Sequence, residues 1–268
     1  MTVPDRRSYP PAGDLADDPT TQGIRSPIRF TISSAYAELR RAQKPARGVS
    51  FYSRLVNRKL GRFLAALGAS MGISPNLVTA ASALATAAAV ALLALGRPSL
   101  GVGLGVAGLL VLGFALDSAD GQLARLTRSG SPAGEWLDHV VDAAKSVALH
   151  AGVLVAAYRH FNISTTWLLV PIGYQVTAVV VFAAGVLREL LGRVAARDTV
   201  PPPGPARRSS WSALILLPAD FGVLAVAFLT LAWPPIFVVV YSALFIANLV
   251  VGATLLTKWL RELRALDA

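Results

Sequence analysis

Residues 116–145 read LDSADGQLARLTRSGSPAGEWLDHVVDAAK, a stretch with four aspartates that joins two long apolar segments. An ionised carboxylate in the hydrocarbon of a bilayer is costly, so acids that occur inside or at the edge of apolar helices are normally functional. The two apolar segments therefore indicate the fold, and the acids between them indicate a site.

The composition is typical of a membrane protein. Of the 268 residues, 54% are hydrophobic and only 15% are charged, whereas soluble domains carry about 25% charged residues. A run of roughly 20 apolar residues spans the hydrocarbon core as a helix. We predict six such spans, at about 73–96, 99–126, 133–158, 166–190, 210–232 and 235–258. The lack of cysteine excludes disulfides and thiolate metal sites.

Four regions follow from this pattern. Residues 1–49 are polar and rich in proline, and we expect a largely disordered cytoplasmic tail. Residues 50–72 predict an amphipathic, interfacial helix next to the membrane. Residues 73–258 are the six-helix membrane domain, and 259–268 are a cytoplasmic C-terminal tail. The predicted fold is thus an all-α integral membrane protein with a juxtamembrane helix.

The 50–72 helix has two unlike faces. At helical spacing, one face carries apolar residues, namely Val56, Leu60, Phe63 and Leu67. The other face carries basic residues, namely Arg54, Arg58, Lys59 and Arg62. Such a helix suits a surface of anionic lipid, and it could equally pack on the protein's own cytoplasmic face.

Lysine and arginine are distributed very unevenly among the connections. The N-terminal region, the connections after the second and fourth spans, and the C-terminal tail together hold 22 of the 25 basic residues, while Arg97 and Arg159 lie on the other side and Lys145 lies within a span. Basic connections stay in the cytoplasm. We therefore expect both termini and the aspartate cluster at the cytoplasmic face of the cell membrane.

The four acids have helical spacing. On each span, the acids share one helix face with small residues. The face of the second span carries Asp117, Asp120, Gly121 and Ala124, and the face of the third carries Gly134, Asp138 and Asp142. A short loop makes the two spans antiparallel neighbours, so these faces can enclose one cavity. Repulsion between the acids could be relieved by protonation or by hard divalent cations, which all-oxygen ligands favour. With Arg125 and Arg128 beside them, metals and small residues indicate a pyrophosphate substrate.

At its fixed positions, this stretch resembles the signature of the CDP-alcohol phosphotransferase family. The matching residues are Asp117, Asp120, Gly121, Ala124, Arg125, Gly134, Asp138 and Asp142. The opening of the first span, Ser74-Pro75-Asn76-Leu77-Val78-Thr79, is also similar to the family's usual start. The resemblance covers about residues 50–258 and leaves the N-terminal tail outside.

The resemblance implies a six-helix membrane enzyme, often a homodimer, that moves a substituted phosphate group, usually phosphatidyl, from a CDP-alcohol to the hydroxyl of a second alcohol and releases CMP. The expected donor is CDP-diacylglycerol. By position, the four aspartates resemble ligands of two divalent ions, Mg²⁺ or Mn²⁺, and Asp142 matches the general base. The positions expected to bind CDP are Asp117, Gly121, Ala124, Arg125 and Gly134.

The acceptor is predicted from other residues. Arginines at the end of the fourth span, Arg188, Arg193 and Arg197, suggest a phosphorylated alcohol such as an inositol phosphate or a glycerol phosphate. Lys145 could touch a phosphate or pair with an acid. Both Lys145 and Asp220 lie roughly 15–18 Å from the cytoplasmic ends of their spans, so we predict an intramembrane pair between them; alternatively, Asp220 helps to select the acceptor.

Two other functions could use the same acids or the same fold. A cation-coupled transporter could use the same acids, but it would be expected to have matching or inverted halves, and the acids are confined to one helix pair. A non-catalytic membrane scaffold would be expected to lose at least one motif carboxylate, and all four are present. No nucleic-acid partner is expected, because the basic charge is explained by cytoplasmic connections.

Overall fold

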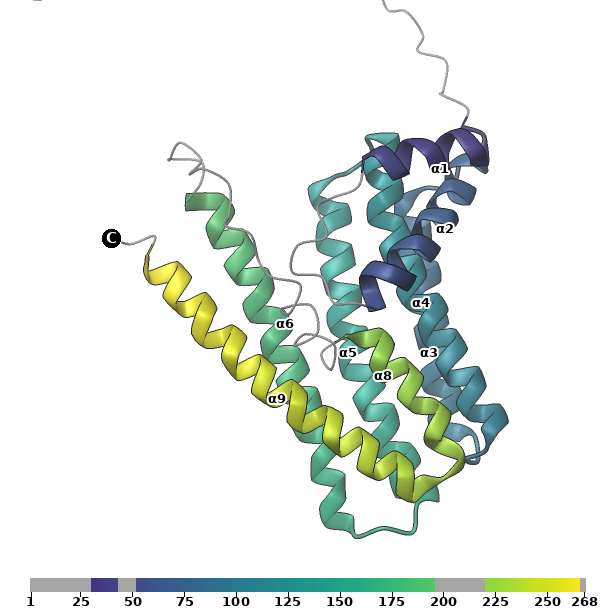
Figure 1. The fold of residues 1–268 in the computed structure, drawn as a ribbon, viewed down its shortest axis with the longest axis vertical. Coiled ribbons are helices and arrows are strands. Elements are labelled where there is room, and N and C mark those ends of the chain that lie inside the picture. Colours follow the sequence, from purple (N-terminus) through teal and green to yellow (C-terminus); the bar gives the residue numbers. More distant parts are fainter. Residues whose placement is uncertain (1–29, 43–51, 196–219, 266–268) are drawn as a thin grey trace, which may run out of the picture.

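The computed structural model describes residues 30–42, 52–195 and 220–265, and every regular element in these ranges is a helix (Figure 1). The first elements are α1 (Ile32–Arg41), the π-helix η1 (Ser53–Asn57) and α2 (Arg58–Ser70). The motif helices follow, with α3 (Pro75–Leu95), α4 (Leu100–Thr127) and α5 (Pro132–His160). The remaining elements are η2 (Thr165–Leu168), α6 (Leu169–Ala195), α8 (Phe221–Ala227), η4 (Phe228–Ala232) and α9 (Pro234–Arg264).

Five of the described helices are long and apolar enough to cross a membrane, namely α3, α4, α5, η2 with α6, and α9. The chain is therefore a multi-pass, all-α membrane protein. The predicted span 210–232 lies partly outside the described residues, and its described part, Phe221–Ala232, is too short to cross alone. Six spans thus stay a prediction. The predicted disordered tail also falls mostly outside the described residues.

The boundaries of the motif helices follow from local sequence. Both α3 and α5 begin with a Ser-Pro pair, in which the serine is the N-cap and the proline takes the first helical position. Ser74 accepts from the N–H of Leu77, and Ser131 accepts from the N–H of Gly134. Proline is tolerated there because the first N–H groups of a helix lack intrahelical partners. These caps set where the α5 acids enter the bundle.

The described helix ends that border the charged connections lie at one end of the bundle (Figure 1). Helices α1 and α2, the connection between α4 and α5, and the C-terminal ends of α6 and α9 all lie toward that end. The turns that join α3 to α4, α5 to α6, and η4 to α9 lie toward the other. This grouping agrees with the charge pattern, and the direction of insertion remains a prediction.

Two apolar cores hold the helices together. The larger lies between α3, α4, α5, η4 and α9, and its fully buried large side chains include Leu93, Leu110, Phe228, Phe237 and Tyr241. The smaller lies between α1, α2 and α4 and consists mainly of small residues and leucines. The N-terminal helices are therefore packed onto the motif helix α4.

Helix α2 packs through its small residues, and only Arg62 departs from the predicted faces. Its small residues, among them Gly61, Ala65 and Ala69, are buried, whereas the predicted apolar face stays open, with Phe63 51% exposed. Arg62, predicted on the cationic outer face, is instead buried and lies over the Tyr36 ring at 5.3 Å. The reason is steric, because small residues allow α2 to approach α4 more closely than leucine or phenylalanine would.

Candidate active site

Three of the four motif aspartates form one group. Carboxylate oxygens of Asp117, Asp138 and Asp142 lie within 4.8 Å of one another, and all three residues are half-buried. Asp117 comes from α4, and the other two stand one turn apart on α5. The Oδ1 atom of Asp138 is buried and has no hydrogen-bond partner among the described residues. An unpartnered buried acceptor beside two other acids is what a cation would satisfy.

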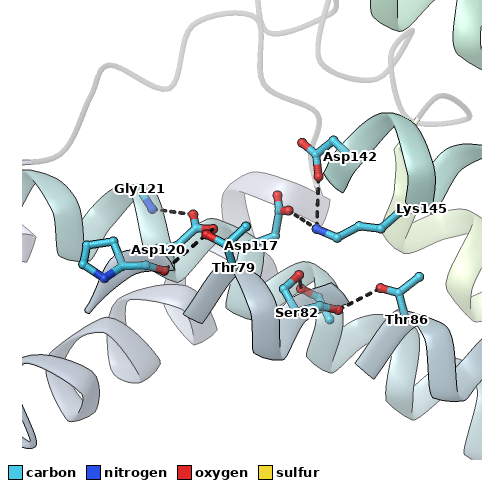
Figure 2. Close-up of polar contacts among 10 residues, drawn as sticks. Thr79, Ser82, Thr86, Asp117, Asp120, Gly121, Asp142 and Lys145 are labelled. Carbon is cyan, nitrogen blue, oxygen red and sulfur yellow. Dashed lines mark hydrogen bonds and ion pairs between the residues drawn. The ribbon is translucent and has the colours of Figure 1, made fainter. Parts of the chain in front are cut away.

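The fourth acid, Asp120, is directed toward α3. Its carboxylate accepts a hydrogen bond of 2.6 Å from the Thr79 hydroxyl, and its other oxygen accepts from the N–H of Gly121. Figure 2 shows Asp120 with Thr79 and Gly121 on one side of Asp117, and Asp142 with Lys145 on the other. The four acids were predicted as one set. In the structure three of them form a group, and the fourth, Asp120, lies beside it and is hydrogen-bonded to Thr79.

Lys145 balances part of this negative charge. Its ammonium group donates to Asp117 and also to Asp142, the latter at 3.0 Å. Lys145 lies one turn beyond Asp142 on α5, which brings its amine back toward the acids (Figure 2). The predicted pair between Lys145 and Asp220 is therefore wrong, and of the two roles considered for Lys145, pairing with acids is the one observed.

A large cavity adjoins the acids on the Asp120 side. Its volume is about 710 Å³, and helices α3, α4, α5 and α6 contribute to its walls. The walls include the small and basic motif residues Gly121, Ala124, Arg125 and Gly134 together with Asp120 and Asp138. A Cβ atom on Gly134 would lie 3.2 Å from the Ser131 hydroxyl and 3.3 Å from Asn76 Oδ1. The glycine therefore prevents crowding where α3 meets α5.

The arginines predicted for the acceptor are paired with acids. Arg193 binds Glu135 and Glu189, each at 2.6 Å, at the edge of the large cavity. Arg188 binds Glu262 through two nitrogens, at 2.7 and 3.0 Å, and so links α6 to α9. Arg197 lies outside the described residues. Neither described arginine lies among the three grouped aspartates.

Asp220 joins the N-terminal segment to α8. It is 4% exposed, caps α8 through the Gly222 N–H at 3.0 Å, and accepts from Ser53 through its N–H at 2.9 Å and its hydroxyl at 3.3 Å. Burial and the charge of Asp220 raise the pKa of nearby Tyr52. Because Asp220 is the N-cap of α8, an N–H group at the helix start and the two groups of Ser53 satisfy the carboxylate in place of Lys145.

Sequence reasoning missed several polar residues of the site. Thr79 and Asn76 stand in the Ser-Pro-Asn-Leu-Val-Thr segment that opens α3, whose spacing places Thr79 one turn after Pro75. The similarity of that segment to the usual start of the family indicated that it matters, but it did not predict a contact between Thr79 and Asp120. Ser53 had no signal at all, because it meets Asp220 across 167 residues of sequence.

Comparison with known protein families gives one match for this chain. The profile of the family described as CDP-alcohol phosphatidyltransferase matches residues 72–259, which include all four motif acids. A search of curated proteins finds no match.

Proposed function

This chain belongs to the CDP-alcohol phosphatidyltransferase family, whose members move a phosphatidyl group from a CDP-alcohol donor to an acceptor alcohol, and we propose that its donor is CDP-diacylglycerol. The observation that carries the proposal is the group of Asp117, Asp138 and Asp142 at the edge of a cavity large enough for a nucleotide. The reaction then gives two products, the new lipid and CMP.

We propose that the large cavity, hereafter the nucleotide cavity, holds the CDP part of the donor. Gly121, Ala124 and Gly134 leave room for a flat group close to the helix backbones. Arg125 lines the same cavity, and its guanidinium suits a phosphate because it presents several N–H donors in one plane. Asp117 does not line this cavity, but it is grouped with Asp138, which does. We propose that Asp117 contacts the CDP phosphates from this position.

The donor set fits divalent metal. The acids offer only oxygen, which hard cations prefer, and Asp138 Oδ1 lacks any partner among the described residues. We propose that Asp117, Asp138 and Asp142, with Asp120 beside them, hold two ions of Mg²⁺ or Mn²⁺. Bound there, such ions neutralise negative charge on a diphosphate.

The chain's own residues then provide positioning and proton transfer. The acceptor hydroxyl attacks the phosphorus next to the lipid, the bond from that phosphorus to the bridging oxygen breaks, and its electron pair leaves with CMP. Asp142 takes the proton of the attacking hydroxyl as general base. Little other covalent chemistry is required, because phosphoryl transfer depends mainly on positioning and electrostatics.

The transporter alternative has less support. The described acids that could bind a cation form one group between α4 and α5, and the family match covers both helices. The phosphorylated acceptor rested on three arginines, two of which are engaged with acids.

The decisive experiment measures CMP release from CDP-diacylglycerol by the purified protein, with Mg²⁺ or Mn²⁺ and a panel of alcohols. We expect activity that chelation with EDTA abolishes and that Asp142→Asn lowers by about a hundredfold or more, as expected for loss of a general base. The matched control is Glu262→Gln in the last turn of α9, an acid that binds Arg188 and not the grouped aspartates, and this variant should keep normal activity. Full activity of Asp142→Asn would refute the assigned role.

A further inference from the structure

The four acids divide between two cavities that share no wall residue. Asp120 and Asp138 line the nucleotide cavity, whereas Asp117 and Asp142 line a second, smaller cavity of about 150 Å³. Figure 2 shows the same order, with Asp117 between the Asp120 side and the Asp142 side. Two cavities that meet at one acid group suit a reaction in which two substrates approach one phosphorus from different sides.

The smaller cavity continues deeper into the bundle. It shares Ser146, Phe182 and Phe221 with a third cavity of about 230 Å³ between α5, α6, α8 and α9. We name these two together the inner cavity. Along α5, Asp142, Ser146 and His150 stand four residues apart, so one helix face runs from the acid group along this cavity. The inner cavity therefore leads directly to the proposed general base.

The wall of the inner cavity is built for a small molecule with hydroxyl groups. Apolar and aromatic side chains alternate there with polar ones, so the wall can contact both the carbon skeleton and the hydroxyl groups of a small molecule. His150 is 3% exposed and its Nδ1 lies 2.6 Å from the Tyr241 hydroxyl, while its ring stacks on Tyr174 at 4.3 Å. The Asn248 amide donates to the Tyr174 hydroxyl at 2.7 Å. These contacts hold the polar groups in fixed positions.

The charge of the inner cavity is unsuited to a phosphate. Lys145 is the only lysine or arginine among the described residues that line it, and this amine is already bound to two carboxylates. Asp117, Asp142 and Asp220 also line it. The deeper part of the inner cavity, between α5, α6, α8 and α9, has Asp220 as the only charged side chain among the described residues of its wall. A phosphate in that part would meet an acid and no cation, and like charges at short range are strongly unfavourable. Arg188 and Arg193 do not line it.

We propose that the inner cavity binds the acceptor, and that the acceptor is a small neutral alcohol without a phosphate group. This inference rests on the proposed function and replaces the acceptor type expected from the arginines. The attacking hydroxyl lies at Asp142, and the body of the alcohol lies along α5 between Phe182, Phe221 and Tyr174.

The test combines acceptor pairs with a cavity-filling variant. The acceptors are inositol against inositol phosphate and glycerol against glycerol phosphate, each with CDP-diacylglycerol and Mg²⁺. Ala178 on α6 lines the cavity, so Ala178→Phe should raise the acceptor KM by about tenfold while the donor KM and CMP binding stay unchanged. Ala178→Leu, which adds less volume, should give a smaller rise. Val180→Phe, at a 47% exposed position on the same helix, is the matched control.

The outcomes separate the two proposals. Preference for the unphosphorylated acceptors, with a graded rise in acceptor KM, supports the inference. CMP release with phosphorylated acceptors only, or an unchanged acceptor KM in both Ala178 variants, would overturn it and leave the proposed function intact. A rise in the donor KM alone would also overturn it, because the cavity would then hold a lipid chain. No CMP release with any acceptor would overturn both proposals.

Discussion

At the scale of single residues, the acids of this protein differ in how their charge is satisfied. Asp220 receives three hydrogen bonds from N–H and O–H groups, Asp120 receives the Thr79 hydroxyl, and Asp117 and Asp142 share one ammonium group. Asp138 keeps one buried oxygen without a partner among the described residues. The acid that lacks a partner is the one expected to gain most from a bound cation.

Asp220 should contribute to stability through these bonds. Asp220→Ala removes the cap of α8 and leaves the half-buried Ser53 N–H without an acceptor, which should lower the free energy of unfolding by about 1–3 kcal/mol. Asp220→Asn should lose less, because asparagine is also a good N-cap. Denaturation of the detergent-solubilised protein measures both. Equal stability of the wild type and the alanine variant would show that the Ser53 contact contributes nothing.

At the scale of elements, close approach between helices depends on small residues. A Cβ atom on Gly61 of α2 would lie 2.8 Å from the Ser118 Cβ and Oγ on α4. Ser118 directly precedes Ala119 and Asp120 and follows Asp117, so the position of α2 is coupled to the acid-bearing turn of α4. The neighbouring helix is thus part of what holds the site in place.

Gly61→Ala should push α2 away from α4 and lower the free energy of unfolding by about 1–3 kcal/mol, as overpacking does. Gly101→Ala on α4 is the matched control, because a Cβ there meets nothing within 4 Å and alanine is the better helix former by about 1 kcal/mol. Thermal unfolding of the two variants gives the comparison. If both variants unfolded alike, the close contact between α2 and α4 would have no energetic role.

At the scale of the whole molecule, the charge pattern and the fold agree. The described helix ends that border the basic connections lie at one end (Figure 1), and basic connections are retained in the cytoplasm. The acid group stands near that end, so the same asymmetry that orients the chain would place the site within reach of a cytoplasmic nucleotide. Whether two copies associate, as the family resemblance implies, stays a prediction.

The orientation can be measured directly, because the chain has no cysteine of its own. Single cysteines at Ala265, after α9, and at Arg97, between α3 and α4, are both exposed and lie at opposite ends. In sealed right-side-out vesicles, a membrane-impermeant maleimide should label Arg97→Cys and not Ala265→Cys, and inverted vesicles should reverse the result. Labelling of Ala265→Cys from outside would mean that the site faces away from the cytoplasm.

Local chemistry is enough to predict much of this protein. Helix spacing placed the acids of α4 and α5 on single faces, the Ser74-Pro75 pair marked the start of the first span, and apolar length identified the described spans, because each is a pattern within one helix. The partners of Lys145, Asp120 and Asp220 depended on the tertiary structure. Ser53 meets Asp220, and Thr79 meets Asp120, only after distant helices pack, and α8 begins at Phe221, after its cap Asp220, inside the predicted span 210–232. Sequence alone contains the spacing of a helix face, but the packing of helices decides what that face meets.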